Sequence, residues 1–311
     1  MTYKIYIPID STALSLGAND VFYAITAEAK KRKIDLTVIR NGSRGLFWLE
    51  PLVEVETKSG RVAFGPVTTN DIEKLFDQEF YLGKEGLLFL GLTDDLHWLK
   101  NQERLTFARV GITDPLDIND YEKHAGFNGL RKAIELEPQL IVNEVTDSGL
   151  RGRGGAAFPT GIKWQTVLNT PSKTKYIVCN ADEGDSGTFS DRMIMENDPF
   201  VLIEGMIIAG MAVGAEYGYI YLRSEYPDAQ EVLNKAINIA KEKGFLGNNI
   251  LSSGYNFDLE VTRAAGAYIC GEETSLLESL EGKRGMVRYK PPLPAIEGLY
   301  GKPTAVNNVI T

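Results

Sequence analysis

Cysteine and histidine are scarce in this chain, which limits the metal and thiol chemistry that it can carry. The sequence contains two cysteines, Cys179 and Cys270, and two histidines, His97 and His124. Two thiols build neither a disulfide framework nor a four-cysteine cluster, and they suit a reducing cytosol. No histidine is near Cys270 in the sequence, so a cysteine–histidine dyad and a histidine-rich zinc site are disfavoured. We therefore predict no metal site and no nucleophile–base pair.

Basic charge and long hydrophobic runs are also in short supply. The chain carries 33 lysines and arginines against 42 aspartates and glutamates, a formal net charge of -9. Broad nucleic-acid binding needs a basic face, so this balance argues against it. The longest apolar run, 201–215, contains Glu204 and is shorter than the roughly 20 residues of a membrane span. The first ten residues, MTYKIYIPID, are too short and too polar for a signal peptide, so we expect a cytoplasmic chain.

What the chain does contain is an apolar fraction of 43% and a charged fraction of 24%, as globular proteins do. Residues 1–105 show the order βαβ followed by ββα, which predicts a thioredoxin-like domain. Its expected strands are 3–9, 35–41, 52–57 and 61–65, and its expected helices are 18–33 and 69–80. Residues 1–178 lack cysteine. We therefore expect this domain to dock or scaffold, with the aromatic stretch at 45–48 as a candidate contact, rather than to exchange disulfides.

Residues 106–311 are predicted to form a second, Rossmann-like α/β domain with a mainly parallel sheet. Helices are expected at 119–135 and 138–147 and from about Thr160. The regular part follows, with strands at 175–180, 216–223 and 257–263 and helices at 199–214, 226–243 and 272–280. Strands that alternate with helices indicate a parallel sheet covered on both faces. Ligands bind such sheets at the carboxyl ends of the strands.

A glycine-rich segment at 149–164 reads GLRGRGGAAFPTGIKW. Glycine lets the backbone approach a ligand closely, and neighbouring cations suggest a bound phosphate. Taken alone, the segment fits a phosphate-binding loop or a glycine-rich surface turn.

Acidic and small residues follow the expected strands. The loop at 180–189 holds three acids, an amide and two hydroxyls. It fits either a solvated turn, a weak cation loop, or a site for ribose hydroxyls, where carboxylates favour NAD over NADP. Two glutamates at 272–273 open a helix, where they also complement the helix dipole. The asparagine pair at 307–308 suits a helix cap or a phosphate. Together these loops favour a redox cofactor over hydrolytic catalysis.

Four long segments place the chain near a known family. GLRGRGGAAFPTGIKW, CNADEGDSGTFSDR, GAYICGEETSLLESLEGKRG and GKPTAVNNV resemble the signature segments of the 51-kDa-type flavoprotein subunit of respiratory complex I. Diaphorase subunits of NAD-reducing hydrogenases and beta subunits of molybdenum- or tungsten-dependent, NAD-linked formate dehydrogenases share these segments. RNGSRGLFWLEPLVEVET, at 40–57, resembles the formate dehydrogenase beta subunit more than the complex I subunit.

The resemblance implies an FMN site beside an NADH site, with hydride passing between nicotinamide C4 and flavin N5. The residues that it assigns to FMN are Gly152, Arg153, Gly154, Lys163, Asn180, Asp182, Tyr268, Gly271, Glu272, Asn307 and Asn308. Those that it assigns to NAD are Phe158, Asp185, Glu273 and Lys290. Because the bound cofactors exchange the hydride themselves, no catalytic side chain is assigned.

Three positions depart from the family pattern. Asp185 replaces a glutamate, so we expect the shorter acid to reach the dinucleotide through water. Leu293 replaces a phenylalanine, which removes one wall of the adenine sandwich. Ala157 replaces a common glycine, a mild change unless the position needs a positive φ.

The resemblance also sets expectations about assembly. Family members continue with a β-grasp domain and a helical bundle that holds a four-iron four-sulfur cluster, and the two cysteines here cannot supply its ligands. The partners implied are the iron–sulfur gamma subunit and the molybdenum- or tungsten-containing alpha subunit of a formate dehydrogenase. Alternatives left open are the diaphorase subunit of complex I or of an NAD-reducing hydrogenase, and a truncated, non-catalytic module.

Overall fold

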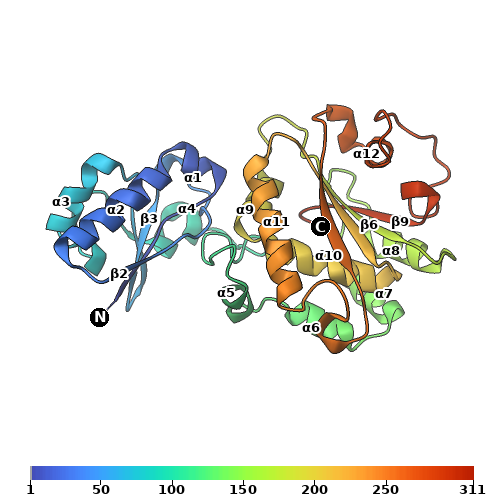
Figure 1. Cartoon of the computed structure of the whole chain (residues 1–311), viewed down its shortest axis with the longest axis horizontal. Coiled ribbons are helices and arrows are strands. Elements are labelled where there is room, and N and C mark those ends of the chain that lie inside the picture. Colours follow the sequence, from blue (N-terminus) through green and yellow to red (C-terminus); the bar gives the residue numbers. More distant parts are fainter. Residues whose placement is uncertain (1) are drawn as a thin grey trace. The chain divides into compact units, whose positions relative to one another are not determined.

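The computed structural model describes residues 2–311, which divide into two compact units (Figure 1). The first unit contains the residues up to Asp120 together with Glu196–Asp198. The second contains Tyr121–Met195 and Pro199–Thr311. Among the described residues, no helix is both long and apolar enough to cross a bilayer.

The first unit extends past residue 105, the boundary that the sequence predicted. Segment 109–112 is held by side chains of the unit's sheet region. Asn41 donates to the Gly111 carbonyl over 2.8 Å, and Arg61 donates to the Ile112 carbonyl over 2.7 Å. Gly111 itself has φ +82°, and a Cβ there would lie 2.5 Å from the Arg44 side chain. These tertiary contacts, which no local pattern reveals, attach segment 109–112 to the first unit.

The sheet of the first unit has the thioredoxin-like arrangement that the sequence predicted. Its strand order is β2-β1-β3-β4-β5, in which β1 and β2 are parallel and the remaining pairs antiparallel. The strands are β1 (Tyr3–Tyr6), β2 (Leu36–Ile39), β3 (Val53–Thr57), β4 (Gly60–Phe64) and β5 (Phe89–Leu92). Its helices are α1 (Ser11–Ser15), α2 (Ala18–Arg32), α3 (Ile72–Asp77) and α4 (His97–Lys100). Helix α5 (Ile118–Lys123) contains the boundary between the units, which falls after Asp120.

The two faces of strand β3 are buried in different ways. Val53 and Val55 point into the apolar core, which also contains Ile25 of α2. Glu54 points to the opposite face, where Arg44 and Arg61 pair with it at 2.8 Å and 3.0 Å. The buried charge is therefore compensated from both sides, as burial of an ion requires.

The sheet of the second unit is fully parallel, with the order β8-β7-β6-β9. Its strands are β6 (Tyr176–Ala181), β7 (Tyr217–Leu222), β8 (Asp258–Arg263) and β9 (Thr304–Asn308). The first three match the predicted strands, and β9 was not expected as a strand. The helices are α6 (Asn128–Ile134), α7 (Pro138–Asp147), α8 (Thr160–Asn169), α9 (Ser190–Asn197), α10 (Pro199–Val213), α11 (Pro227–Glu242) and α12 (Glu273–Leu280).

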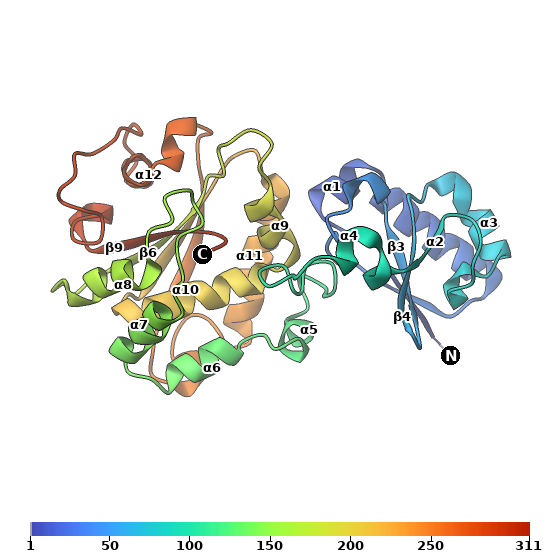
Figure 2. The same ribbon diagram turned by 180° about the vertical axis from the view of Figure 1, so that it is seen from behind.

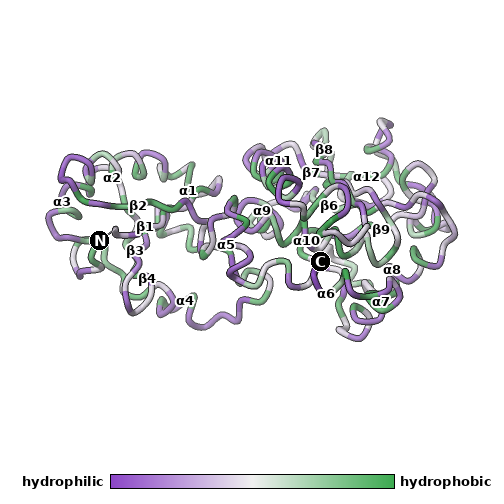
Figure 3. The backbone as a smooth tube through the Cα atoms, turned by 60° about the horizontal axis from the view of Figure 1, so that its bottom comes forward, coloured by the Kyte–Doolittle hydropathy of each residue, from purple (hydrophilic) through white to green (hydrophobic). Residues whose placement is uncertain are grey.

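Helices cover both faces of this sheet. On one face, Val178 and Val306 share a core with Leu276 and Leu277 of α12. Helix α10 packs against β6 and β7 (Figure 2), and its residues are mostly hydrophobic (Figure 3). This layered arrangement leaves the carboxyl ends of the strands as the place where a ligand binds.

Glu204 is the acidic residue inside the apolar run, and the fold explains it. Its carboxylate accepts from the backbone N–H groups of Phe127 and Leu130, at 2.8 Å and 3.0 Å, and from the Tyr121 hydroxyl. It therefore satisfies the free N–H groups at the start of α6. The single helix predicted at 119–135 is wrong: positive φ angles at Ala125 and Phe127 divide it into α5 and α6.

Candidate functional site

The site lies where the strand order of the second unit reverses. The chain passes from β6 to β7 on one side of β6, and later returns to place β9 on the other side. In doubly wound sheets, this switch point is where the crevice for a ligand forms. Asn180 near the end of β6 pairs in register with Asn308 of β9, and Cys179 pairs with Asn307. The predicted amide side chains therefore come together at the switch point.

Two adjoining cavities occupy this position. The first cavity has a volume of about 480 Å³ and is lined by the glycine segment, α8, β9 and the loop that contains Lys290 and Leu293. The second, which we call the acidic cavity, has a volume of about 550 Å³ and is lined by the loop at 182–191 and by Tyr268. The wall shared by both consists of Gly154, Asn180, Gly271, Glu272 and Asn308.

All the residues that the resemblance assigned to FMN or NAD line one cavity or both. Those that line only the first cavity are Gly152, Phe158, Lys163, Glu273, Lys290 and Asn307. Those that line only the acidic cavity are Arg153, Asp182, Asp185 and Tyr268. Among the residues assigned to NAD, Asp185 is thus separated from the other three, which share the first cavity.

The glycine segment forms a closed loop before α8. The Gly152 N–H donates to the Phe158 carbonyl and the Thr160 N–H to the Leu150 carbonyl, both at 2.9 Å. A Cβ on Gly154 would lie 3.3 Å from the Asn308 side chain, so the loop closely approaches β9. Ala157 has φ +50°, the left-handed region that favours glycine. The departure at Ala157 therefore falls where a positive φ is required.

Lys163 is a half-buried cation in the first cavity. Its ammonium donates to the Val306 carbonyl over 2.6 Å, and burial lowers the pKa of Lys163. None of the carboxylates in residues 2–311 forms an ion pair with it. Thr160, at the start of the same helix, is 2% exposed and its hydroxyl has no hydrogen-bond partner among these residues. A helix start with an unpaired cation and an unpartnered hydroxyl fits an anionic group such as phosphate.

Glu272 has a structural role that the sequence left open. One carboxylate oxygen accepts from the backbone N–H groups of Thr274 and Ser275, at 2.8 Å and 2.9 Å, and so caps α12. The other oxygen lies 3.1 Å from the Lys290 ammonium, which also pairs with Glu273 at 2.6 Å. Partial burial acts to raise the pKa of Glu272, but these hydrogen bonds outweigh it and the pKa is lowered. The Lys290 ammonium therefore lies between the two glutamates and pairs with both.

The acidic cavity contains carboxyl groups of unequal burial. The Tyr268 hydroxyl donates to Asp185 over 2.8 Å, and both side chains are exposed. Asp182 is buried, and burial raises its pKa to about 6, although the Arg223 charge acts in the opposite direction. A Cβ on Gly184 would lie 2.9 Å from Asp182 and 3.0 Å from the Tyr268 ring, so this position has no room for a side chain.

The sequence analysis assigned no cofactor to several residues that line the cavities, among them Thr160, Glu183 and Asp191. Glu183 accepts from the Asp191 and Arg192 N–H groups, at 2.8 Å and 3.1 Å, and so caps α9. The one available signal was a Ser–Asp pair after the acidic loop, which is a common helix start. It was not used because the helix itself was not expected.

A comparison with protein families matches the part of the chain that contains both cavities. A family model described as "Nuo51 FMN-binding domain" matches residues 145–311. A subunit of the NADH-quinone oxidoreductase of Aquifex aeolicus (strain VF5) is 56% identical over 194 residues, which are 62% of this chain and 45% of that protein. The HndC subunit of the NADP-reducing hydrogenase of Solidesulfovibrio fructosivorans is 51% identical over 212 residues, 68% of this chain and 43% of that protein.

One solved structure is similar over nearly the whole chain. An NAD⁺-reducing [NiFe]-hydrogenase in the air-oxidized state aligns with a TM-score of 0.54 and 29% identity, covering 99% of this chain and 50% of that one. The chain therefore spans about half the length of the relatives it matches. These matches confirm the family expected from the four segments. They do not test the finer assignment to formate dehydrogenase.

Proposed function

Because the chain belongs to the family of the Nuo51 FMN-binding domain, we propose that it is the diaphorase part of an electron-transfer oxidoreductase. In this function it binds FMN and NAD(H) side by side and passes electrons to iron–sulfur clusters of its assembly. The observation that carries the proposal is the pair of cavities that meet at Asn180 and Asn308, at the switch point of the sheet. Two joined cavities suit two ligands that must touch.

FMN fits the donors that the two cavities present. We assign its phosphate to Lys163, the Thr160 hydroxyl and the start of α8, where the chain lacks a carboxylate partner for the cation among the described residues. Because Gly154 has no side chain and lies close to β9, its backbone groups are open to the flavin. When bound, FMN supplies the chemistry, because it accepts a hydride and releases electrons one at a time. The chain's own task is to bind and orient.

The dinucleotide fits the first cavity beside the flavin. Phe158 offers a ring face for stacking, and Leu293 forms an apolar but non-aromatic wall of the same cavity. The Lys290–Glu273 pair is available to fix the ribose and pyrophosphate. In the adjoining acidic cavity, Asp185 adds a carboxylate, which opposes a 2′-phosphate on any part of the dinucleotide that reaches this cavity. We therefore propose NAD(H) rather than NADP(H) as the substrate.

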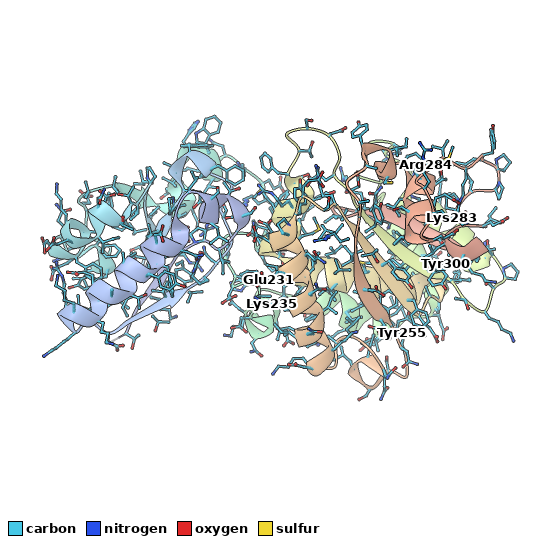
Figure 4. All side chains as sticks on the ribbon, turned by 45° about the horizontal axis from the view of Figure 1, so that its top comes forward. Glu231, Lys235, Tyr255, Lys283, Arg284 and Tyr300 are labelled. Carbon is cyan, nitrogen blue, oxygen red and sulfur yellow. The ribbon has the colours of Figure 1, made fainter. Side chains whose placement is uncertain are left out.

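The proposal is tested by reconstituting the purified chain with FMN and removing free flavin on a desalting column. We expect flavin absorbance to remain with the protein, and NADH to reduce ferricyanide, an acceptor that needs no iron–sulfur cluster. Glu231→Gln is treated in the same way as a control for the procedure. Glu231 is an exposed residue of α11, and within the described residues it pairs only with Lys235 (Figure 4). If no flavin remains bound to either protein, the assignment of the site is wrong.

For the assembly, we propose a cytoplasmic, NAD-dependent formate dehydrogenase, in which formate is oxidised on a molybdenum- or tungsten-containing alpha subunit. Support for this comes from segment 40–57 alone. The named relatives favour a second candidate, the diaphorase of complex I or of an NAD-reducing hydrogenase. Affinity capture from the source cell separates them: a molybdenum or tungsten protein supports the first, and a hydrogenase or a quinone-reducing complex supports the second.

A further inference from the structure

The acidic cavity has a buried carboxyl group with no cationic partner among residues 2–311. Asp191, in the first turn of α9, is 4% exposed and lines this cavity. It forms no ion pair with any lysine, arginine or histidine of the described chain. Its Oδ2 accepts from the side-chain amide of Asn308 over 2.6 Å. Asn308 belongs to the wall shared by both cavities, and we assign it to the flavin. Asp191 is therefore hydrogen-bonded to a flavin-binding residue.

From this placement we propose that Asp191 stores a proton for the flavin site: its carboxylate takes up a proton when electrons enter the flavin and releases it when they leave. The inference rests on the proposed function, since it requires a flavin in these cavities. A carboxyl group is suited to this role where its two protonation states have similar free energies and where a charge change nearby can shift the balance.

The groups that face Asp191 come from three elements besides its own. Glu183, in the loop after β6, accepts the Asp191 N–H over 2.8 Å, and Asn308 approaches from β9. Cys179, on β6, is the third group. Burial is the larger cause and the Asp191 charge the smaller one that raise the pKa of the Cys179 thiol, which therefore stays protonated. On α9 itself, the Arg192 guanidinium lies against the Phe189 and Tyr226 rings.

Burial and then the neighbouring Glu183 charge raise the pKa of Asp191 to about 7, and the Asn308 hydrogen bond acts in the opposite direction. At neutral pH the group is therefore close to its midpoint. An added negative charge in the cavity raises this pKa further, so the carboxylate binds a proton.

Atoms and charge balance in this step. A hydride, carrying two electrons and one proton, leaves C4 of the dihydronicotinamide and bonds to the flavin, so the nicotinamide is oxidised and the flavin gains one negative charge. Asp191 forms one O–H bond with a proton delivered from solvent, and the charge of the flavin site returns to its earlier value. When iron–sulfur clusters take the two electrons one at a time, the flavin N–H bond formed by the hydride and the Asp191 O–H bond both break, and both protons return to solvent.

The experiment measures the midpoint potential of bound FMN as a function of pH, using the full chain reconstituted with FMN. For a two-electron couple, each proton taken up contributes about 30 mV per pH unit. At pH 7 a group with a pKa of about 7 takes up at most about half a proton when the flavin is reduced, so we expect a wild-type slope of about 45 mV per pH unit there. The slope should approach about 60 mV per pH unit at higher pH in the wild type and stay at about 30 mV in Asp191→Asn, which are two protons and one. Glu231→Gln, a carboxyl-to-amide change at an exposed side chain of α11 that lines neither cavity, keeps the wild-type slope.

A second measurement needs no variant to fold. The infrared difference spectrum of the wild type, reduced minus oxidised, gains the C=O band of a protonated carboxyl group. Equal slopes in wild type and Asp191→Asn, or the absence of this infrared band, overturn the inference. If the protein still binds flavin in that case, the proposed function stands. Failure of the wild type to bind FMN overturns the proposed function, and the inference with it.

Discussion

Asn180 donates its side-chain amide to the Gly271 carbonyl over 2.9 Å, joining the end of β6 to the turn before α12. The oxygen of the same amide accepts from the Asp182 N–H at 3.2 Å. Both Asn180 and Gly271 belong to the wall between the two cavities. The wall is therefore fixed by contacts within the protein before a ligand arrives, which reduces the cost of binding.

Replacing Lys163 with methionine tests the phosphate site. The change keeps an apolar stem of similar length and removes the one cation that lies unpaired in the first cavity among the described residues. A charged hydrogen bond contributes about 1.5–3 kcal/mol, so we expect FMN affinity to fall by about 10- to 100-fold. Fluorescence titration of FMN measures it, with Lys235→Met on α11 as the control. Equal affinities would place the phosphate elsewhere.

Ala157→Gly tests the strain in the glycine segment. Ala157 adopts φ +50°, which an L side chain resists, so we expect glycine to stabilise the protein by about 1 kcal/mol. The neighbouring Ala156 is not among the residues with positive φ, and Ala156→Gly should therefore destabilise by about 0.4–1 kcal/mol. Urea unfolding of both variants measures the difference. The same sign of effect in both would show that backbone strain at 157 is absent.

Glu204→Gln tests the cap that α10 supplies to α6. The amide can accept only through its single oxygen, so the N–H groups of Phe127 and Leu130 compete for it. We expect a loss of about 1.5–3 kcal/mol, the value for a hydrogen bond to a charged group. Thermal unfolding followed by circular dichroism measures it, with the exposed Glu231→Gln as the matched change. Equal stabilities of the two variants would contradict the capping role.

Glu50 in the first unit makes the stability depend on pH. Burial raises its pKa to about 7 from the ordinary 4.5, although hydrogen bonds from Ser43 and Leu52 oppose the shift. Between these two values the folded state binds more protons than the unfolded state, so stability falls as pH rises from about 4.5 to 7. The fall in free energy of unfolding should be about 3 kcal/mol or less. Glu50→Gln should flatten this part of the profile, and an unchanged profile would rule Glu50 out.

Much of the fold could be predicted because it follows from local periodicity. The alternation at 175–180 and 216–223 and the helical spacing at 138–147 correspond to β6, β7 and α7. The residues that the family resemblance assigned to the cofactors line the two cavities, and their roles there stay a prediction.

What could not be predicted depends on contacts distant in sequence. Strand β9 has five residues and ends in two asparagines, so its pattern resembles a loop, and pairing with β6 makes it a strand. Helix α9 is capped by Glu183, which precedes it by several residues, so the Ser–Asp pair at its start is the one local signal for it. Asp191 was overlooked for the same reason: its burial is a property of the assembled sheet.

The most direct test of the central claim is a titration of the FMN-loaded chain with NADH without oxygen. We predict that one equivalent of NADH bleaches the visible absorbance of the bound flavin. Glu273→Ala, which removes the Lys290 partner at 2.6 Å, should retain FMN but raise the KM for NADH about tenfold, the loss of roughly one hydrogen bond to a charged group. Bound flavin that NADH leaves unbleached at any concentration would contradict the account.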